Sequence, residues 1–367
     1  MNYLLSFIFI THTCLFTFGQ LSNPGLMDTL GGEKIKKVTI GGYLDTYYSY
    51  DFNQPKNGTI PYFVSSANHN DFSINLTYLD VRYTDSRVRA RFVPGFGTYM
   101  NANYSNEKGL LKNLVEASVG ICISKKRNIW MESGVLGSPF TNESAISKDH
   151  FMYTRSLAPE YVPYYLSGIK VSVPINSKWN IYTYILNGWQ QITDQNNGKS
   201  IATQLEYRPN KSNLLNWNTY IGDERSTFNP SFRMRYFSDF YWISYPSKKF
   251  SFITCIYGGV QEFSNRKHAS WWQANYTGKW KFSDKHSLAG RFEYFNDPQN
   301  CMIINQFTNE KVGIFSAGVC YNITIQEHAL FRVDARQFYT QYPMFTNQIS
   351  ANTTKTFVLT GNLTVWF

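Results

Sequence analysis

Polar and apolar residues alternate along almost the whole chain from Val38 to Phe367, and this pattern constrains the fold more than any other feature. The alternation comes in segments of roughly ten residues that turn-forming residues separate. A two-residue period is typical of β-strands, because successive side chains point to opposite faces of a sheet. The same period, repeated over many segments, predicts an all-β chain and favours an antiparallel transmembrane barrel with one face in lipid.

Two kinds of connection separate these segments. The short ones hold polar turn residues and lie at residues 84–87, 124–127, 175–178, 209–212, 246–249, 283–285 and 324–327. The long ones lie between them, at residues 53–70, 103–112, 137–163, 188–199, 224–229, 264–267, 297–310 and 340–352. Short turns that alternate with long loops are typical of the up-and-down topology of outer-membrane barrels. We therefore expect about 16 strands, within a range of roughly 14–18, with the turns and both chain ends in the periplasm.

The alternation also predicts which side chains face the inside of the barrel. Arg87, Arg89 and Arg91 share one face of their segment, while Val88 and Phe92 share the other. A charge on the lipid face costs about 2–4 kcal/mol at the membrane midplane, so such rows should face a water-filled lumen. Applied to the charged segments, this rule predicts as pore-lining residues Arg82, Arg87, Arg89, Arg91, Arg233, Arg235, Arg291, Arg332, Arg336, Asp80, Glu132, Glu293 and Asp334.

The predicted lumen carries more arginines than acids. With Arg208, Glu116 and Glu206 included, ten inward arginines stand against six inward acids. A ring of fixed cations favours the passage of anions. In the alternative interpretation, arginines and acids pair with each other and stabilise the wall as a hydrogen-bonded lattice. The row of three arginines described above holds no acid, so it is the strongest candidate for ion selectivity.

The third long connection, residues 137–163, is longer than an ordinary hairpin loop. We expect it to fold inward and narrow the lumen. Its charged residues would then line a constriction, namely Glu143, Lys148, Asp149, Arg155 and Glu160. The alternative is a surface loop that shields the mouth of the barrel.

The first residues of the chain predict export. An apolar stretch from Leu4 to Phe18 precedes small residues, as in a signal peptide, and it is too short for a comfortable transmembrane helix. We expect residues 1–19 to be removed after Gly19, residues 20–37 to form a short periplasmic segment, and residues 38–367 to form the outer-membrane barrel. The remaining cysteines match no zinc pattern, and we expect free thiols at Cys122, Cys255, Cys301 and Cys320.

The chain ends on an amphipathic strand that runs to the last residue. Its apolar face, which we expect in lipid, holds Phe357, Leu359, Leu363, Val365 and Phe367. Its polar face, which we expect in the lumen, holds Thr360, Asn362 and Thr364. A free terminal Phe resembles the signal that the barrel assembly machinery reads, so we predict Phe367 as the assembly signal.

Other classes of protein fit the sequence less well. A soluble β-sandwich also alternates, but it does not need the aromatic residues near strand ends that a membrane girdle requires. The chain holds no G-x-S-x-G, P-loop, H-E-x-x-H or CxxC motif, and its histidines stand singly, so we predict no enzyme activity, no metal and no cofactor. The net charge of +10 is spread over lumen faces and turns, which disfavours nucleic-acid binding.

Several stretches of the chain resemble a known family. "VRARFVPGFGTYMNANY", "LKNLVEASVG", "LNGWQQI" and "LNWNTYIGDE" are similar to sequences of the OmpL-like β-barrel porins of Bacteroidetes-type bacteria. The resemblance is densest from Val88 to Glu224. It implies an outer-membrane pore, and it brings no catalytic residues.

The sequence as a whole therefore predicts a porin for passive diffusion of small hydrophilic solutes, with a preference for anions. The expected partners are outer-membrane lipid, the barrel assembly machinery and those solutes, and a homotrimer is an arrangement that such barrels allow. One alternative is a non-conducting barrel that acts as an adhesin or binding scaffold through its loops. Another is an outer-membrane hydrolase without a recognised motif.

Overall fold

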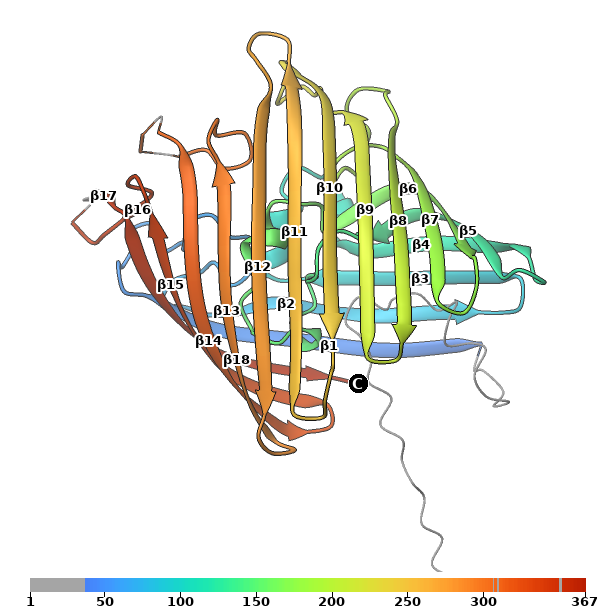
Figure 1. Cartoon of the computed structure of the whole chain (residues 1–367), viewed down its shortest axis with the longest axis horizontal. Coiled ribbons are helices and arrows are strands. Elements are labelled where there is room, and N and C mark those ends of the chain that lie inside the picture. The colour runs from blue at the N-terminus through green and yellow to red at the C-terminus, as the bar shows by residue number, and fades with distance from the viewer. Residues whose placement is uncertain (1–36, 306, 309, 350–351) are drawn as a thin grey trace, which may run out of the picture.

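The computed structural model describes residues 37–305, 307–308, 310–349 and 352–367. The predicted signal peptide and nearly all of the predicted periplasmic segment lie outside the described residues. Sixteen strands close into one antiparallel barrel, in which β18 pairs with β1 to complete the ring (Figure 1). The predicted fold class and strand number are thus confirmed, and a soluble β-sandwich is excluded.

The barrel strands range in length from the 8 residues of β7 to the 15 residues of β14. In chain order they are β1 (Val38–Asp51), β2 (Phe72–Thr84), β3 (Val88–Phe96), β4 (Leu114–Ser124), β5 (Ile129–Gly137), β6 (Tyr165–Pro174), β7 (Trp179–Leu186), β8 (Ser200–Asn210), β9 (Asn213–Asp223), β10 (Phe232–Ser244), β11 (Phe250–Phe263), β12 (Ala269–Lys281), β13 (His286–Asp297), β14 (Val312–Gln326), β15 (Ala329–Thr340) and β18 (Lys355–Trp366). Each strand is paired with the strands that precede and follow it in this list.

Each predicted short turn reaches a connection between two strands, although the turn predicted at residues 324–327 lies mostly within β14, which continues to Gln326. For example, β2 ends at Thr84 and β3 begins at Val88, on either side of the first predicted turn. The turns therefore gather at the end of the barrel where β1 begins and β18 ends, and the long loops gather at the other end. We refer to these as the periplasmic and the extracellular end, following the predicted orientation.

The long loops hold short elements that a two-residue period could not predict. The loop after β3, called L2 (residues 97–113), contains α1 (Thr98–Asn103) and the 3₁₀ helix η2 (Gly109–Asn113). The loop after β5, called L3 (residues 138–164), contains the 3₁₀ helix η3 (Ser147–Asp149) and α2 (Leu157–Glu160). The loop after β15 carries a hairpin of β16 (Phe345–Thr346) and β17 (Asn352–Thr353). In the described ranges, no helix has the length and apolar character needed to cross a membrane.

Burial along the last strand shows how the two faces differ. Leu359, Leu363 and Val365 are exposed on the outside of β18, as the sequence predicted. The polar residues that alternate with them, Thr360 and Asn362, are buried inside the ring. Large aromatic side chains are exposed on the outside of other strands, among them Trp217, Trp272 and Trp280. The interior carries buried polar and charged side chains, together with a cluster of apolar ones that packs around residues such as Phe140, Phe237 and Phe295. An apolar, aromatic exterior is the arrangement that lipid imposes on a barrel.

Candidate functional site

L3 folds into the barrel rather than over its mouth. In Figure 1 its green ribbon lies behind β10–β12, within the ring. Its residues form hydrogen bonds with inward side chains of β1, β9, β10, β12, β13, β14 and β15. These strands form one continuous arc of the wall together with β11 and β18. L3 therefore covers the inner face of that arc and leaves β2–β8 on the opposite side.

Three predicted pore-lining arginines hold the backbone of L3. Arg291, Arg332 and Arg336 each donate a hydrogen bond of 2.7 Å to a backbone carbonyl, those of Thr154, Ser147 and Arg155 respectively. Arg332 also donates to the Ser147 hydroxyl at 2.6 Å. All three arginines are buried. These guanidinium groups therefore bind the loop and are not available to bind a solute.

Inward acids hold the backbone amides of the same loop. Glu293 accepts a hydrogen bond of 2.5 Å from the Leu157 amide, and Asp334 accepts one of 3.0 Å from the Thr154 amide. Glu293 is also paired with the wall arginines Arg291 and Arg336. The wall is therefore complementary to L3, with arginines opposite its carbonyls and acids opposite its amides. Hydrogen bonds to charged groups are among the stronger ones, so this arrangement fixes the loop in the lumen.

The five residues predicted for a constriction all lie on L3 within the ring, and most of their charges are paired. Glu143 lies 3.5 Å from the guanidinium of Arg291, and Lys148 lies 2.9 Å from Asp149. Arg155 lies 4.0 Å from the carboxylate of Asp45 on β1. Glu160 accepts a hydrogen bond from the backbone amide of Val64 and so joins L3 to the loop after β1.

A second charged network lies on β2–β6, toward the periplasmic end. Arg91 lies 2.8 Å from Asp80 and 2.5 Å from Glu116, and Arg82 lies 2.6 Å from Asp80. Arg89 lies 2.8 Å from Glu132. Two members of the predicted arginine row are therefore neutralised by acids on neighbouring strands. The third member, Arg87, is exposed in the turn before β3.

The structure also adds charges that the sequence analysis did not place in the lumen. The buried, inward acids Asp45, Asp51, Asp239 and Asp297 join the six predicted ones, and Lys170 and Lys279 join the arginines. The predicted surplus of inward cations is therefore too large. The missed acids belong to segments rich in tyrosine and phenylalanine, where the alternation of charge and apolar residues is hard to see.

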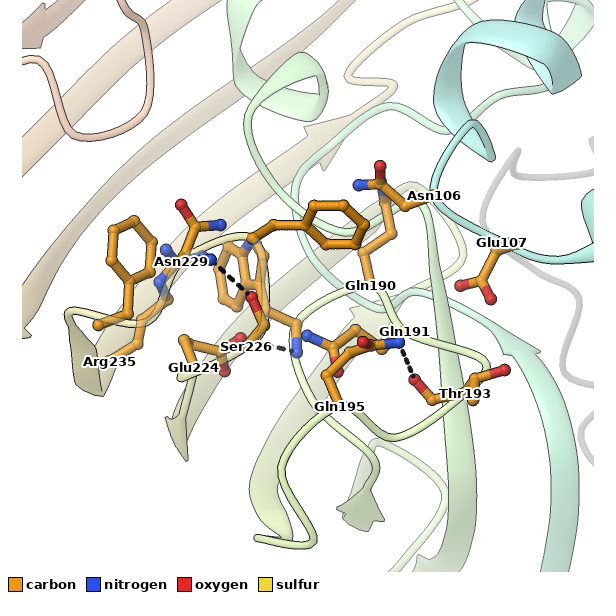
Figure 2. A pocket seen from close by; sticks show the side chains of 13 residues that line it. Asn106, Glu107, Gln190, Gln191, Thr193, Gln195, Glu224, Ser226, Asn229 and Arg235 are labelled. Atoms are coloured by element: carbon orange, nitrogen blue, oxygen red, sulfur yellow. Dashed lines mark hydrogen bonds between the residues drawn. The ribbon is translucent and has the colours of Figure 1, made fainter.

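The remaining predicted arginines lie near the extracellular end. Arg233 donates to the backbone carbonyls of Pro230 and Phe232. Arg235 lines a pocket between L2, the loop after β7 and the loop after β9 (Figure 2). Nothing in the sequence pattern pointed to this pocket, because its residues come from three separate loops.

The periplasmic end carries a strong excess of positive charge. Exposed cations in and beside the turns are Lys37, Arg87, Lys125, Lys126, Arg127, Lys178, Lys211, Lys248, Lys249 and Lys285. The acids of the same turns are Asp85, Asp284 and Glu327. A positive mouth raises the local concentration of anions.

The described part of the chain offers no group of three or more His, Cys, Asp or Glu side chains placed to bind a metal ion. Cys122, Cys255, Cys301 and Cys320 are free thiols.

The protein is an outer-membrane barrel of the porin type. It combines a closed ring of 16 strands and an apolar exterior with short turns at one end and a long loop folded into the lumen. The chain belongs to the family described as "Putative beta-barrel porin-2, OmpL-like", whose model matches residues 37–367. The predicted family is thus confirmed, while the bacterial group named with it stays a prediction. No curated protein is similar enough in sequence to count as a match.

Solved structures of outer-membrane proteins share the fold at low sequence identity. The outer membrane channel DcaP of Acinetobacter baumannii has a TM-score of 0.61 and 8% identity, with 90% of this chain and 97% of that chain covered. The anion-selective porin from Comamonas acidovorans has a TM-score of 0.58 and 8% identity, with 90% and 99% covered. OmpT of Vibrio cholerae in its trimer form has a TM-score of 0.56 and 10% identity, with 90% and 99% covered.

Proposed function

We propose that the protein is a passive channel for small hydrophilic solutes rather than an enzyme. We also propose that a cleaved signal peptide exports it and that the barrel assembly machinery inserts it into the outer membrane. The observation that carries this proposal is L3, held by charged side chains inside a 16-stranded ring. A barrel of this size leaves an aqueous channel when side chains alone point inward, and a loop fixed within it sets the size of the passage.

We infer the position of that passage from the exposure of the inward charges. Under L3, the side chains of Arg291 and Glu293 are at most 1% exposed. On the opposite wall, the side chains of Arg82 and Lys170 are 35% and 14% exposed, so they keep contact with water. We therefore place the solute path between L3 and the inner face of β2–β6, with the paired charges of that wall as its lining.

We further propose a preference for anions, with its main source at the periplasmic mouth rather than in the paired arginines of the lumen. A fixed charge selects ions only where a counter-charge does not cancel it. Arg89 and Arg91 are neutralised by neighbouring acids, whereas the turn cations greatly outnumber the turn acids. Anion selectivity is also the property for which the Comamonas acidovorans porin is named.

Conductance of the purified protein in a planar bilayer tests the channel and its selectivity together. We expect discrete ion-conducting events, and reversal potentials in a salt gradient that report anion preference. Lys248→Gln with Lys249→Gln should lower that preference, because both lysines stand in one exposed turn at the periplasmic end. Lys56→Gln, at an exposed site in the loop after β1, serves as the control. An absence of channels would overturn the proposal, and cation-selective potentials would overturn its anion preference.

A second candidate function is a non-conducting barrel that binds a partner through its loops. The observation that favours it is the tight contact between L3 and the wall, since a loop held so firmly could also close the lumen. Conductance near zero, with binding to a surface partner retained, would select this candidate.

We also propose that three copies assemble in the membrane. The apolar exterior of the barrel is compatible with contact to a second copy as well as to lipid. Sedimentation of the detergent-solubilised protein tests this proposal, and a monomer at all concentrations would reject it.

A further inference from the structure

A polar pocket of about 170 Å³ opens at the extracellular end of the barrel. It lies between L2, the loop after β7 (L4, residues 187–199), the loop after β9 (L5, residues 224–231) and the first residues of β10. Figure 2 shows Arg235 and Glu224 on one side of this space and Asn106 and Glu107 on the other. Its volume is small for a drug-sized molecule and suits a solute of one ring.

The pocket contains a buried cation with unused donors. Arg235 is 5% exposed, and its guanidinium carbon lies 5.0 Å from the centre of the Trp189 ring and 5.5 Å from that of Trp271. Its Nε donates to the side-chain oxygen of Gln261 at 2.8 Å, which fixes the plane of the guanidinium. Within the described residues, Arg235 forms no ion pair, and its two terminal amino groups have no hydrogen-bond acceptor. The guanidinium is thus held in one orientation, and its two terminal amino groups are open to the pocket, where a ligand can accept hydrogen bonds from them.

A second polar group of the pocket also lacks a partner. The side-chain oxygen of Gln191 is buried and accepts no hydrogen bond from the residues that the structure describes. Gln191 belongs to a set of five amide side chains around the pocket, the others being Asn106, Gln190, Gln195 and Asn229 (Figure 2). The amide of Gln190 is already bonded at both ends, to the Tyr164 amide and to Asn103. The other amides offer donors and acceptors in one plane, so they can bind groups that both donate and accept.

The charges of the pocket disfavour a strongly anionic or cationic ligand. Glu107 accepts hydrogen bonds from the Tyr165 hydroxyl and the Ile192 amide, each at 2.8 Å, so its carboxylate is already engaged. Glu224 accepts hydrogen bonds from the Tyr220 hydroxyl and the Trp189 amide. Burial raises the pKa of Glu224, although the neighbouring Arg235 opposes this shift. One cation and two engaged acids leave a site without a dominant charge.

Aromatic side chains border the same space. Phe228 on L5 is 72% exposed, so its ring is available at the rim, and Phe232 lines the pocket beside it. The pocket therefore suits a ligand ring that has apolar carbon–hydrogen faces and polar edges. Such a ligand would contact the aromatic side chains with a face and the amide and guanidinium groups with its edges.

We infer that this pocket binds the ring of a neutral saccharide, and that saccharides are therefore among the solutes of the channel. This inference rests on the proposed channel function and names a class of solute for it. Hydroxyl groups both donate and accept, which matches the amide side chains of the pocket, and adjacent hydroxyls suit the two terminal amino groups of Arg235.

The pocket stands directly above the loop that narrows the lumen. The ring of Trp189 stacks on that of Phe140 in L3, with 5.8 Å between their centres. The side chain of Gln190 accepts a hydrogen bond of 2.7 Å from the Tyr164 amide, at the end of L3. A sugar held in the pocket is thus held at the extracellular entrance of the proposed solute path.

Isothermal titration calorimetry of the detergent-solubilised protein tests the inference without requiring conductance. The probes are glucose, galactose, xylose and N-acetylglucosamine, with gluconate as an anion of the same carbon skeleton as glucose. We expect at least one neutral sugar to bind, and Arg235→Gln to weaken that binding by about tenfold, because it removes hydrogen bonds from a charged donor.

Two further variants separate binding from folding. Phe228→Ala changes a ring that is 72% exposed, so it should leave the barrel intact and still weaken sugar binding several-fold. Arg266→Gln, at an exposed site in the loop after β11, should leave binding unchanged.

The possible outcomes distinguish the saccharide pocket from the channel function on which it rests. Binding of gluconate without binding of any neutral sugar would overturn the saccharide assignment in favour of an anion site. Intact conductance with no sugar binding would overturn the pocket and leave the channel standing. Sugar binding without conductance would support the pocket and overturn the channel.

Discussion

At the scale of single residues, a glycine makes one of the lumen ion pairs possible. Arg89 on β3 and Glu132 on β5 are both paired in register with Gly120 on the strand between them. A Cβ atom at Gly120 would lie 2.8 Å from Cγ of Glu132 and 3.1 Å from Cγ of Arg89. Because Gly120 has no side chain, the two charges meet across β4 at 2.8 Å, and Lys170 joins Glu132 at 2.6 Å.

This arrangement predicts a large effect of removing the shared acid. Glu132→Gln should lower the free energy of unfolding by about 3 kcal/mol, because it leaves two cations without their partner in a mostly buried site. The measurement is urea unfolding of the barrel in lipid vesicles. Asp284→Asn, which breaks the exposed pair with Lys281, should have no measurable effect. Equal effects of the two substitutions would show that the lumen pair is no stronger than a surface pair.

The arginine row gives a second test at the same scale. If the lattice neutralises Arg89 and Arg91, then Asp80→Asn should raise anion preference, since Arg82 and Arg91 would lose the carboxylate they share. Changing Arg87, Arg89 and Arg91 together to Gln should lower that preference, because it removes the exposed Arg87 and takes an arginine partner from Asp80, Glu116 and Glu132. Reversal potentials measure both changes. If the reversal potentials are unchanged in both variants, the three arginines stabilise the barrel wall and do not contribute to ion selectivity.

At the scale of elements, L3 is joined to the loop after β1 (L1, residues 52–71) by the Tyr161 hydroxyl, which donates to the Tyr62 carbonyl, and by one carboxyl group. Glu160 accepts a hydrogen bond of 2.8 Å from the Val64 amide of L1 and one of 3.1 Å from the Tyr164 hydroxyl. Burial raises the pKa of Glu160 from 4.5 to about 7, although the Val64 hydrogen bond and the charges of Arg155 and Arg336 oppose the shift.

This raised pKa predicts that the L1–L3 contact depends on pH. The carboxyl binds its proton more tightly in the folded state, so its stabilising contribution is complete below about pH 4.5 and is lost as pH rises through 7. Hydrogen–deuterium exchange of the L1 segment around Val64, corrected for intrinsic rates, should therefore be slower at pH 5 than at pH 8. Glu160→Gln should remove most of this dependence, and Glu262→Gln, at an exposed site, should retain it. An unaltered pH profile in Glu160→Gln would assign the effect to another group.

The elements also show which parts of the structure the sequence could predict. Strands and turns depend on neighbours in sequence, so the two-residue period and the turn residues were sufficient to place them. The partners of Arg91 depend on register, which pairs β3 with β2 and β4 and brings Asp80 and Glu116 within reach. The short turn at residues 84–87 places Asp80 near the arginine row, so that pairing could be predicted, but no local pattern contains the pairing with Glu116. The saccharide pocket was beyond prediction for the same reason, since three loops meet there only after the ring has closed.

At the scale of the whole molecule, the last residue of the chain extends the seam between β1 and β18 that closes the ring. Gly42 on β1 and Phe367 exchange two backbone hydrogen bonds of 3.1 Å each. A Cβ atom at Gly42 would lie 2.2 Å from Cε1 of the Phe367 ring, so the ring occupies the space that the glycine leaves. Two residues at opposite ends of the barrel sequence therefore complete the seam, in addition to the role of Phe367 as the proposed assembly signal.

These two roles of Phe367 can be separated by experiment. Deleting Phe367 should reduce the amount of folded barrel in the outer membrane several-fold, while channels that do form should keep their conductance. Gly42→Val keeps the terminal Phe but displaces its ring, so it should reduce assembly only if packing at the seam matters. Gly361→Ala is the matched control on β18, because a Cβ atom there meets no atom within 4 Å. Normal assembly of Gly42→Val, together with failure of the deletion, would show that Phe367 acts as a recognition signal alone. Normal assembly of both variants would reject both roles.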